Sequence, residues 1–213
     1  MLHHVPDAAS ATPPLLHDVA STGIAELDHA LGGLFWGDNA VFEVADPPMV
    51  EPFYRAAAAV KEHYDRRLYV DLSGVPTELR GFDVIDARPG SELSQPAPLF
   101  RAIVERCRRG EANLVLFETM ETMIERWGAD VAARFFAHCC PQLLELGAIA
   151  YWSAPSGALY PGLRRTIEEV TQCVLPALTP APVLANGRLV LRRGGGPTDR
   201  RHNDRRLAQP RSI

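Results

Sequence analysis

Apolar segments of strand length, alternating with segments of helical pattern, constrain the fold of this sequence most strongly. ANLVLFET, residues 112–119, contains an unbroken apolar run, which is typical of a strand buried on both faces of a parallel sheet. Four further segments have the composition of strands: NAVFEVA at 39–45, RLYVDL at 67–72, GFDVIDA at 81–87 and GAIAYWSA at 147–154. Helical patterns occupy 24–31, 53–64, 99–109, 119–146 and 161–170, with a break expected near Gly128 and a kink at Pro141. This alternation predicts an α/β fold with a central, mostly parallel sheet.

The two ends of the chain differ in composition from its middle. Residues 1–20 are rich in Ala, Pro and His without periodicity, and we expect an irregular arm there. TQCVLPAL at 171–178 and GRLVLRR at 187–193 predict an antiparallel pair joined around Asn186-Gly187. Residues 194–213 combine glycines and arginines with few apolar side chains, and we expect them to be disordered. The core domain is therefore expected over residues 21–193.

The bulk composition excludes several classes of protein. A chain of 213 residues, 46% hydrophobic and 23% charged, is long enough for one α/β domain. No apolar run approaches the roughly 18–20 residues that a membrane-spanning helix needs. The first ten residues lack a basic region followed by an apolar stretch, which argues against a secretory signal. We therefore expect a cytoplasmic protein without membrane contact.

The charge of the chain is distributed unevenly. After Leu191 there are seven arginines and two aspartates, which gives this segment +5 and leaves −9 for the rest of a chain whose net charge is −4. Such a basic segment can contact nucleic acid, although it lacks the interleaved aromatic residues of many nucleic-acid binders. Lys61 is the only lysine. Its position matters because phosphate-binding loops usually contain a lysine.

The four cysteines do not form a metal-binding pattern. Cys107, Cys139, Cys140 and Cys173 contain no C-x-x-C pair, and no histidine lies at zinc-finger spacing from them. His138 precedes two of these cysteines, but adjacent side chains on a helix point about 100° apart and cannot converge on one ion. We therefore expect core cysteines and neither a metal nor another cofactor.

The stretch from Ser21 to Val60 indicates a family. It reads TGI..LD..LGG over residues 22–33, followed by an apolar strand, a turn and a helix. This lead-in resembles that of the RecA, KaiC and RadA type of P-loop ATPase. NLVLFETME at 113–121 lies where the Walker B strand of that family would lie, and residues 143–155 and 167–193 are similar to its later segments in order and pattern.

This resemblance implies a RecA-like three-layer sandwich, with a central, mostly parallel sheet and antiparallel C-terminal strands. The core strands would be Val41–Val44, Leu68–Val70, Leu114–Phe117 and Ile149–Trp152. It further implies that the Leu114 and Ile149 strands lie on the same side of the Val41 strand, with the Ile149 strand nearer. Nucleotide would bind at the strand ends, and related proteins often form rings.

The turn ADPPMVEP, residues 45–52, departs from the family at the Walker A position, where GxxxxGK[ST] is expected. Ala45 and Val50 replace the glycines, Glu51 the lysine and Pro52 the metal-binding hydroxyl. The three prolines of the turn have no N–H to offer a phosphate. A carboxylate in place of an ammonium about 4 Å from a phosphate replaces attraction by repulsion, each about 4 kcal/mol per unit charge. We expect Asp46 and Glu51 to fill the anion site at the helix N-terminus from within the chain.

The other two catalytic positions of the family also differ. Glu118 stands where Walker B has an aspartate, and the alternative is a carboxylate favoured by the dipole of the following helix. After the second strand, where KaiC-like proteins carry acidic residues, the chain has Ser73-Gly74, while Asp71 belongs to the strand. Three independent losses indicate a fold retained without hydrolysis, so no catalytic or cofactor-binding residue is expected at these positions.

The sequence therefore favours a pseudo-ATPase with a degenerate P-loop, which regulates or scaffolds an assembly by binding another protein. Two alternatives stay open. One is an enzyme, either a divergent ATPase or a subunit that completes an active site in a neighbouring ATPase. The other is a nucleic-acid accessory protein that uses the Arg-rich tail. A homo-oligomer is compatible with each of them.

The first prediction concerns the tail. Deleting residues 194–213 should leave the melting temperature within about 2 °C, because changes away from packed features usually have small effects. Ordering this segment would cost about 1–2 kcal/mol per residue with little apolar surface to offset it. Thermal melts of the two chains followed by circular dichroism test this. A decrease of ten degrees would show that the tail docks on the domain.

Overall fold

The computed structural model describes residues 19–74, 79, 81–155 and 160–175. Its centre is a six-stranded sheet in the order β5-β4-β6-β7-β3-β8, and every pairing is parallel. The strands are β3 (Asn39–Val44), β4 (Arg67–Asp71), β5 (Asp83–Asp86), β6 (Leu114–Phe117), β7 (Ile149–Pro155) and β8 (Cys173–Leu175). The predicted core strands are confirmed, and so is the predicted order, because β7 lies between β3 and β6.

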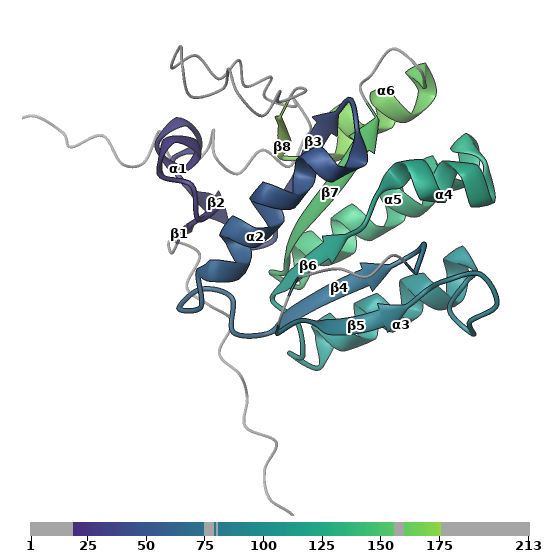
Figure 1. Cartoon of the computed structure of the whole chain (residues 1–213), viewed down its shortest axis with the longest axis horizontal. Coiled ribbons are helices and arrows are strands. Elements are labelled where there is room, and N and C mark those ends of the chain that lie inside the picture. The colour runs from purple at the N-terminus through teal and green to yellow at the C-terminus, as the bar shows by residue number, and fades with distance from the viewer. Residues whose placement is uncertain (1–18, 75–78, 80, 156–159, 176–213) are drawn as a thin grey trace, which may run out of the picture.

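Helices cover both faces of the sheet and complete the three layers (Figure 1). One face carries α2 (Glu51–Ala59) and the lead-in, which consists of β1 (Val19–Ala20), α1 (Ala25–Leu31) and β2 (Leu34–Phe35). The other face carries α3 (Pro96–Arg108), α4 (Met120–Trp127), α5 (Ala129–Glu145) and α6 (Pro161–Val170). None of the helices in the described part of the chain is long and apolar enough to cross a membrane.

The helix boundaries differ from the sequence prediction in a few places. The expected break at Gly128 is confirmed, since it separates α4 from α5, and α5 runs as one helix through Pro141. Helix α2 ends at Ala59, five residues before the predicted end, and α3 starts at Pro96, a residue type that suits the first turn. Strand β8 is parallel to β3. The expected antiparallel partner at 187–193 lies outside the described residues, as do the arm up to residue 18 and the tail.

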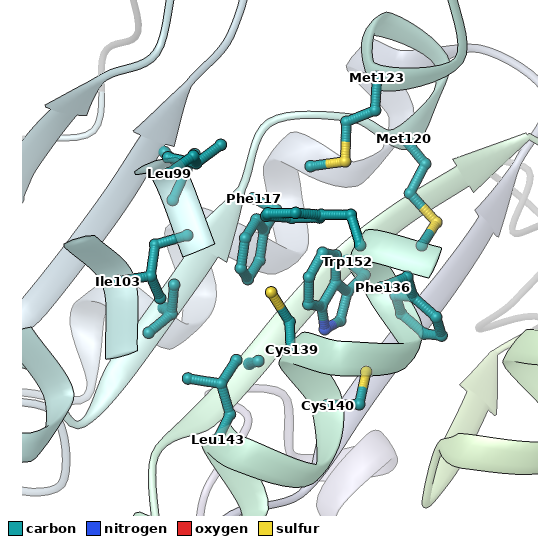
Figure 2. Packing of buried hydrophobic residues seen from close by; sticks show 14 of the residues in the cluster. Leu99, Ile103, Phe117, Met120, Met123, Phe136, Cys139, Cys140, Leu143 and Trp152 are labelled. Atoms are coloured by element: carbon teal, nitrogen blue, oxygen red, sulfur yellow. The ribbon is translucent and has the colours of Figure 1, made fainter. Parts of the chain in front are cut away.

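The core on the α5 side is built around stacked aromatic rings (Figure 2). The ring centroids of Phe117 and Trp152 are 3.5 Å apart with an interplanar angle of 8°. The Trp152 indole donates a hydrogen bond of 3.1 Å to Oδ1 of Asn39, whose amide nitrogen donates to the Cys140 carbonyl at 3.1 Å. The buried side chains of Asn39 and Trp152 are thus paired, which helps to fix the packing of β3, β7 and α5.

All four cysteines are buried, as predicted. Burial raises the pKa of the Cys107 thiol to about 12, and it raises the pKa values of Cys139 and Cys140 as well. His138 is exposed and is bonded through Nδ1 to the Arg134 carbonyl. Among the residues that the structure places, no three His, Cys, Asp or Glu side chains are grouped so as to hold a metal ion.

Replacing Trp152 by alanine should lower the free energy of unfolding by about 3–5 kcal/mol. The change leaves a cavity against Phe117 and removes the hydrogen-bond donor of the buried Asn39 Oδ1. The matched control is Val19→Ala, at a side chain that is 44% exposed, which should change the stability by less than about 0.5 kcal/mol. Urea titrations of the three proteins measure both effects. Equal stability of the Trp152 variant and the wild type would contradict this description of the core.

Candidate functional site at the carboxyl ends of the strands

The parallel sheet gathers the loops that follow β3, β4 and β6 at one edge. These loops contain the segments that the sequence analysis selected: residues 45–50, 72–74 and 118–119. In open α/β sheets, ligands bind at this edge, in the crevice outside the carboxyl ends of the strands. The geometry of the three loops therefore decides whether a nucleotide site is present.

The turn after β3 is a short 3-10 helix, Pro47–Val50, which leads directly into α2. The N–H of Met49 donates to the Asp46 carbonyl at 3.0 Å, and the N–H of Glu51 donates to the Pro48 carbonyl. Three of the eight residues 45–52 are prolines. Met49 and Glu51 already donate their N–H groups to carbonyls within the turn. Five positions of the phosphate-loop segment therefore have no free backbone donor for an anion.

The two acids expected to fill the anion site, Asp46 and Glu51, lie at the start of the turn and at the start of α2. Asp46 is the residue before the 3-10 helix, but its side chain makes no capping hydrogen bond. Glu51 lies in the first turn of α2, where the helix dipole favours an acid. Its carboxylate is paired with Arg55, one turn further along, at 2.6 Å. Glu51, at the position of the expected lysine, is thus paired with a cation of its own helix, α2.

A tyrosine that the sequence analysis missed joins α2 to the strand ends. Tyr54 is 3% exposed, and its hydroxyl donates to the Phe117 carbonyl at 2.6 Å and lies 3.4 Å from the Tyr151 carbonyl. Burial raises the pKa of Tyr54 well above its usual value, with smaller contributions from Tyr69 and Glu118, so the phenol keeps its proton and acts as a donor. Its position two residues after Pro52, on an Ala-rich helix, is the only signal in the sequence.

Glu118, at the Walker B position, is engaged by the loop after β4. Its carboxylate accepts hydrogen bonds from the N–H groups of Leu72, at 2.6 Å, and Ser73, at 2.9 Å, and from the Ser73 hydroxyl. The expected interaction with the next helix is made by Thr119 instead, whose hydroxyl accepts from the Glu121 N–H at 3.1 Å. Glu118 therefore joins the end of β6 to the end of β4.

Arg126, on α4, holds the same loop from its carbonyl side. One terminal nitrogen donates to the carbonyls of Leu72, at 2.7 Å, and Ala87, at 2.8 Å, and the other donates to the Ser94 carbonyl at 2.8 Å. Asp71, the last residue of β4, accepts from the Gly74 N–H at 2.8 Å. Both faces of this loop are thus bound by side chains, and no sequence motif indicated the role of Arg126.

The charges at this edge are mostly negative. The side chains on its described loops and first helical turns include these acids: Asp46, Glu51, Asp71, Glu118 and Glu121. The described cations nearby include Arg55, which pairs with Glu51, and Arg126, which is bound to carbonyls. Arg88 lies against Gly74 and pairs with Asp86 at 2.7 Å. Lys61 lies beyond the far end of α2, ten residues after Glu51, which corresponds to about 15 Å along a helix.

The TGI..LD..LGG lead-in is accounted for by contacts within the chain. Asp28 accepts from the Thr22 N–H at 2.6 Å and from the Ser21 hydroxyl, and Gly32 ends α1 in the left-handed conformation. Asp28 thus reaches back from α1 to residues 21 and 22, and the Thr22 hydroxyl accepts from the Ile24 N–H at 3.2 Å. A Cβ on Gly23 would lie 2.2 Å from the Ala56 carbonyl oxygen, so a glycine is needed where the lead-in meets α2.

Comparisons with known proteins support the fold. No family model matches the sequence, and no curated protein matches it. The structure is similar to that of a KaiC-like protein from the hyperthermophilic archaeon Pyrococcus horikoshii OT3, with a TM-score of 0.58 and 14% sequence identity. The match covers 74% of this chain and 80% of that one. The chain therefore has a RecA/KaiC-like fold.

Replacing Glu118 by alanine should lower the free energy of unfolding by about 1–3 kcal/mol, because two backbone N–H groups lose their acceptor. The matched change Ser73→Ala removes one of the three donors and should cost less. The effects should be non-additive in the double variant, since both residues belong to one network. Urea titrations of the four proteins measure this. A Glu118 variant as stable as the wild type would contradict the structural role.

Proposed function

We propose that this protein is a pseudo-ATPase, a RecA/KaiC-like domain without nucleotide chemistry, which regulates or scaffolds a cytoplasmic assembly by binding another protein. The observation that carries the proposal is the turn after β3. Its prolines, its internal hydrogen bonds and the carboxylate of Glu51 occupy the place of the donors and the cation that a phosphate loop needs.

The remaining parts of the site support the same reading. A nucleotide would also need a metal ligand, but the Glu118 carboxylate already accepts three hydrogen bonds from the loop after β4. A triphosphate would meet an edge on which the described acids outnumber the described cations. Each unit of repulsion about 4 Å away costs about 4 kcal/mol at an effective dielectric constant near 20.

The retained lead-in fits this proposal as well. Its glycine and aspartate have structural partners in this chain, Ala56 for Gly23 and Thr22 for Asp28. A motif that packs the first helix onto α2 is needed by the fold whether or not a nucleotide binds. The motif is therefore compatible with a protein that has kept the scaffold and uses its surface for recognition.

The alternatives give different results in binding experiments. A divergent ATPase, or a subunit that completes a neighbour's active site, should show saturable nucleotide binding alone or with that neighbour. A nucleic-acid accessory protein should bind DNA with an affinity that falls steeply with salt and is lost with residues 194–213. The proposed function predicts neither saturable nucleotide binding nor tail-dependent DNA binding. It predicts that affinity purification from the native host enriches the same partner protein with and without added nucleotide.

We expect no ATP binding at millimolar nucleotide, with or without magnesium, measured by isothermal titration calorimetry. Glu51→Lys should not create a site, because the prolines and the engaged N–H groups of the turn remain. Glu62→Lys, which makes the same charge change at an exposed residue beyond α2, is the matched control. Micromolar binding by the wild type, or by the Glu51 variant alone, would overturn the proposal.

A further inference from the structure

The lead-in meets the turn that follows α2 at Ser21. This part of the chain lies beside α2 and packs against the same face of the sheet (Figure 1). The Ser21 N–H donates to Nδ1 of His63 at 2.9 Å, and the Ser21 carbonyl accepts from the Tyr64 hydroxyl at 2.8 Å. Both backbone groups of Ser21 are thus bound by two adjacent side chains that come shortly after α2.

The side chain of Ser21 passes this attachment on to α1. Its hydroxyl donates to the Asp28 carboxylate and accepts from the Gly23 N–H at 2.9 Å. Asp28 also accepts from the Thr22 N–H, and Gly23 is pressed against the Ala56 carbonyl of α2. Residues 21–23 therefore form one hydrogen-bonded unit, and the bond to His63 is one of its contacts with the rest of the chain.

The bond between Ser21 and His63 exists in only one protonation state of the imidazole. A backbone N–H can only donate, so Nδ1 must carry a lone pair and the ring proton must be on Nε2. A protonated imidazole has an N–H at both nitrogens, which would set two donors face to face. Histidine is the side chain that ordinarily changes charge between about pH 5 and 8.

The groups around the imidazole do not replace the lost bond. The charged groups of the lead-in and of the turn itself are these: Asp28, Lys61, Glu62 and Asp65. Asp28 is bound by residues 21 and 22, and Asp65 accepts from the Asn113 amide at 2.9 Å and pairs with Arg66. Tyr64 lies edge-on to the ring at 6.3 Å, and burial raises its pKa, so it stays a neutral donor. No ion pair joins an acid to His63 in the part of the chain that the structure describes.

We propose that His63 makes the docking of residues 21–23 sensitive to pH, so that the lead-in is held by the neutral imidazole and loosened when the ring is protonated. The docked form excludes the charged ring, so the contact stabilises docking at neutral pH and is lost as the pH falls. An imidazole in water is half-protonated near pH 6.5. If only the released form takes up the proton, the ratio of released to docked form rises about tenfold between pH 7.5 and 5.5.

Amide hydrogen exchange of the full-length chain, followed by NMR, tests the proposal at the bond itself. The protection factor of the Ser21 N–H, corrected for the intrinsic exchange rate, should fall about tenfold when the pH is lowered from 7.5 to 5.5. The amides of β6 should keep their protection, because a central strand opens only with the whole domain. A Ser21 protection factor that changes less than about threefold, or that falls together with those of β6, would overturn the proposal.

Two single variants separate the titration of His63 from a general effect of acid. His63→Gln has no titratable ring, so its Ser21 protection factor should change less than about twofold over the same pH range, whatever its starting value. His138→Gln is the matched control, because His138 is an exposed histidine on α5 that is bonded to the Arg134 carbonyl. It should keep the tenfold decrease. A His63→Gln variant that retains this decrease, or a His138→Gln variant that loses it, would contradict the assignment to His63.

Discussion

The hydrogen bond from Tyr54 to the Phe117 carbonyl fixes where α2 begins relative to the sheet. It joins the first turn of the helix to the end of β6, beneath the turn that would hold a phosphate. The bond is buried and the phenol pKa is raised, so the donor is permanent over the physiological pH range. With the start of α2 held in this way, the 3-10 turn of Pro47–Val50 closes onto its own carbonyls, and the rest of the strand-end edge is arranged around a closed turn.

A second set of contacts holds the loop after β4, where one side chain binds backbone N–H groups and another binds backbone carbonyls. Glu118 takes up its N–H groups and Arg126 takes up its carbonyls, so both kinds of backbone group are satisfied by side chains from β6 and α4. A buried backbone group without a partner costs about 1–3 kcal/mol, which makes such a clamp valuable to the fold without any ligand. Glu118, which follows β6, therefore has a structural role in joining two strand ends.

The sequence predicted the sheet well and the site only in part. The strands β3, β4, β6 and β7 were predictable because runs such as LVLF fit only a strand buried on both faces. The absence of a phosphate loop stays a prediction, which rests on the prolines and the glutamate of residues 45–52 and the donors and charge they change. The roles of Tyr54, Ser73 and Arg126 were not predictable, since each depends on a contact between residues 32–63 positions apart in the chain. Nothing in the local pattern encodes such distances.

The loops after β3, β4 and β6 are bound within the chain, so the open backbone groups of the described residues lie elsewhere. The described chain leaves its backbone groups open along β5, where Val84 is exposed between two aspartates. The same division of charge runs through the whole molecule, since the residues up to Leu191 carry −9 and those after it +5. The acids at the strand-end edge and the arginines after Leu191 thus belong to one uneven distribution of charge along the chain.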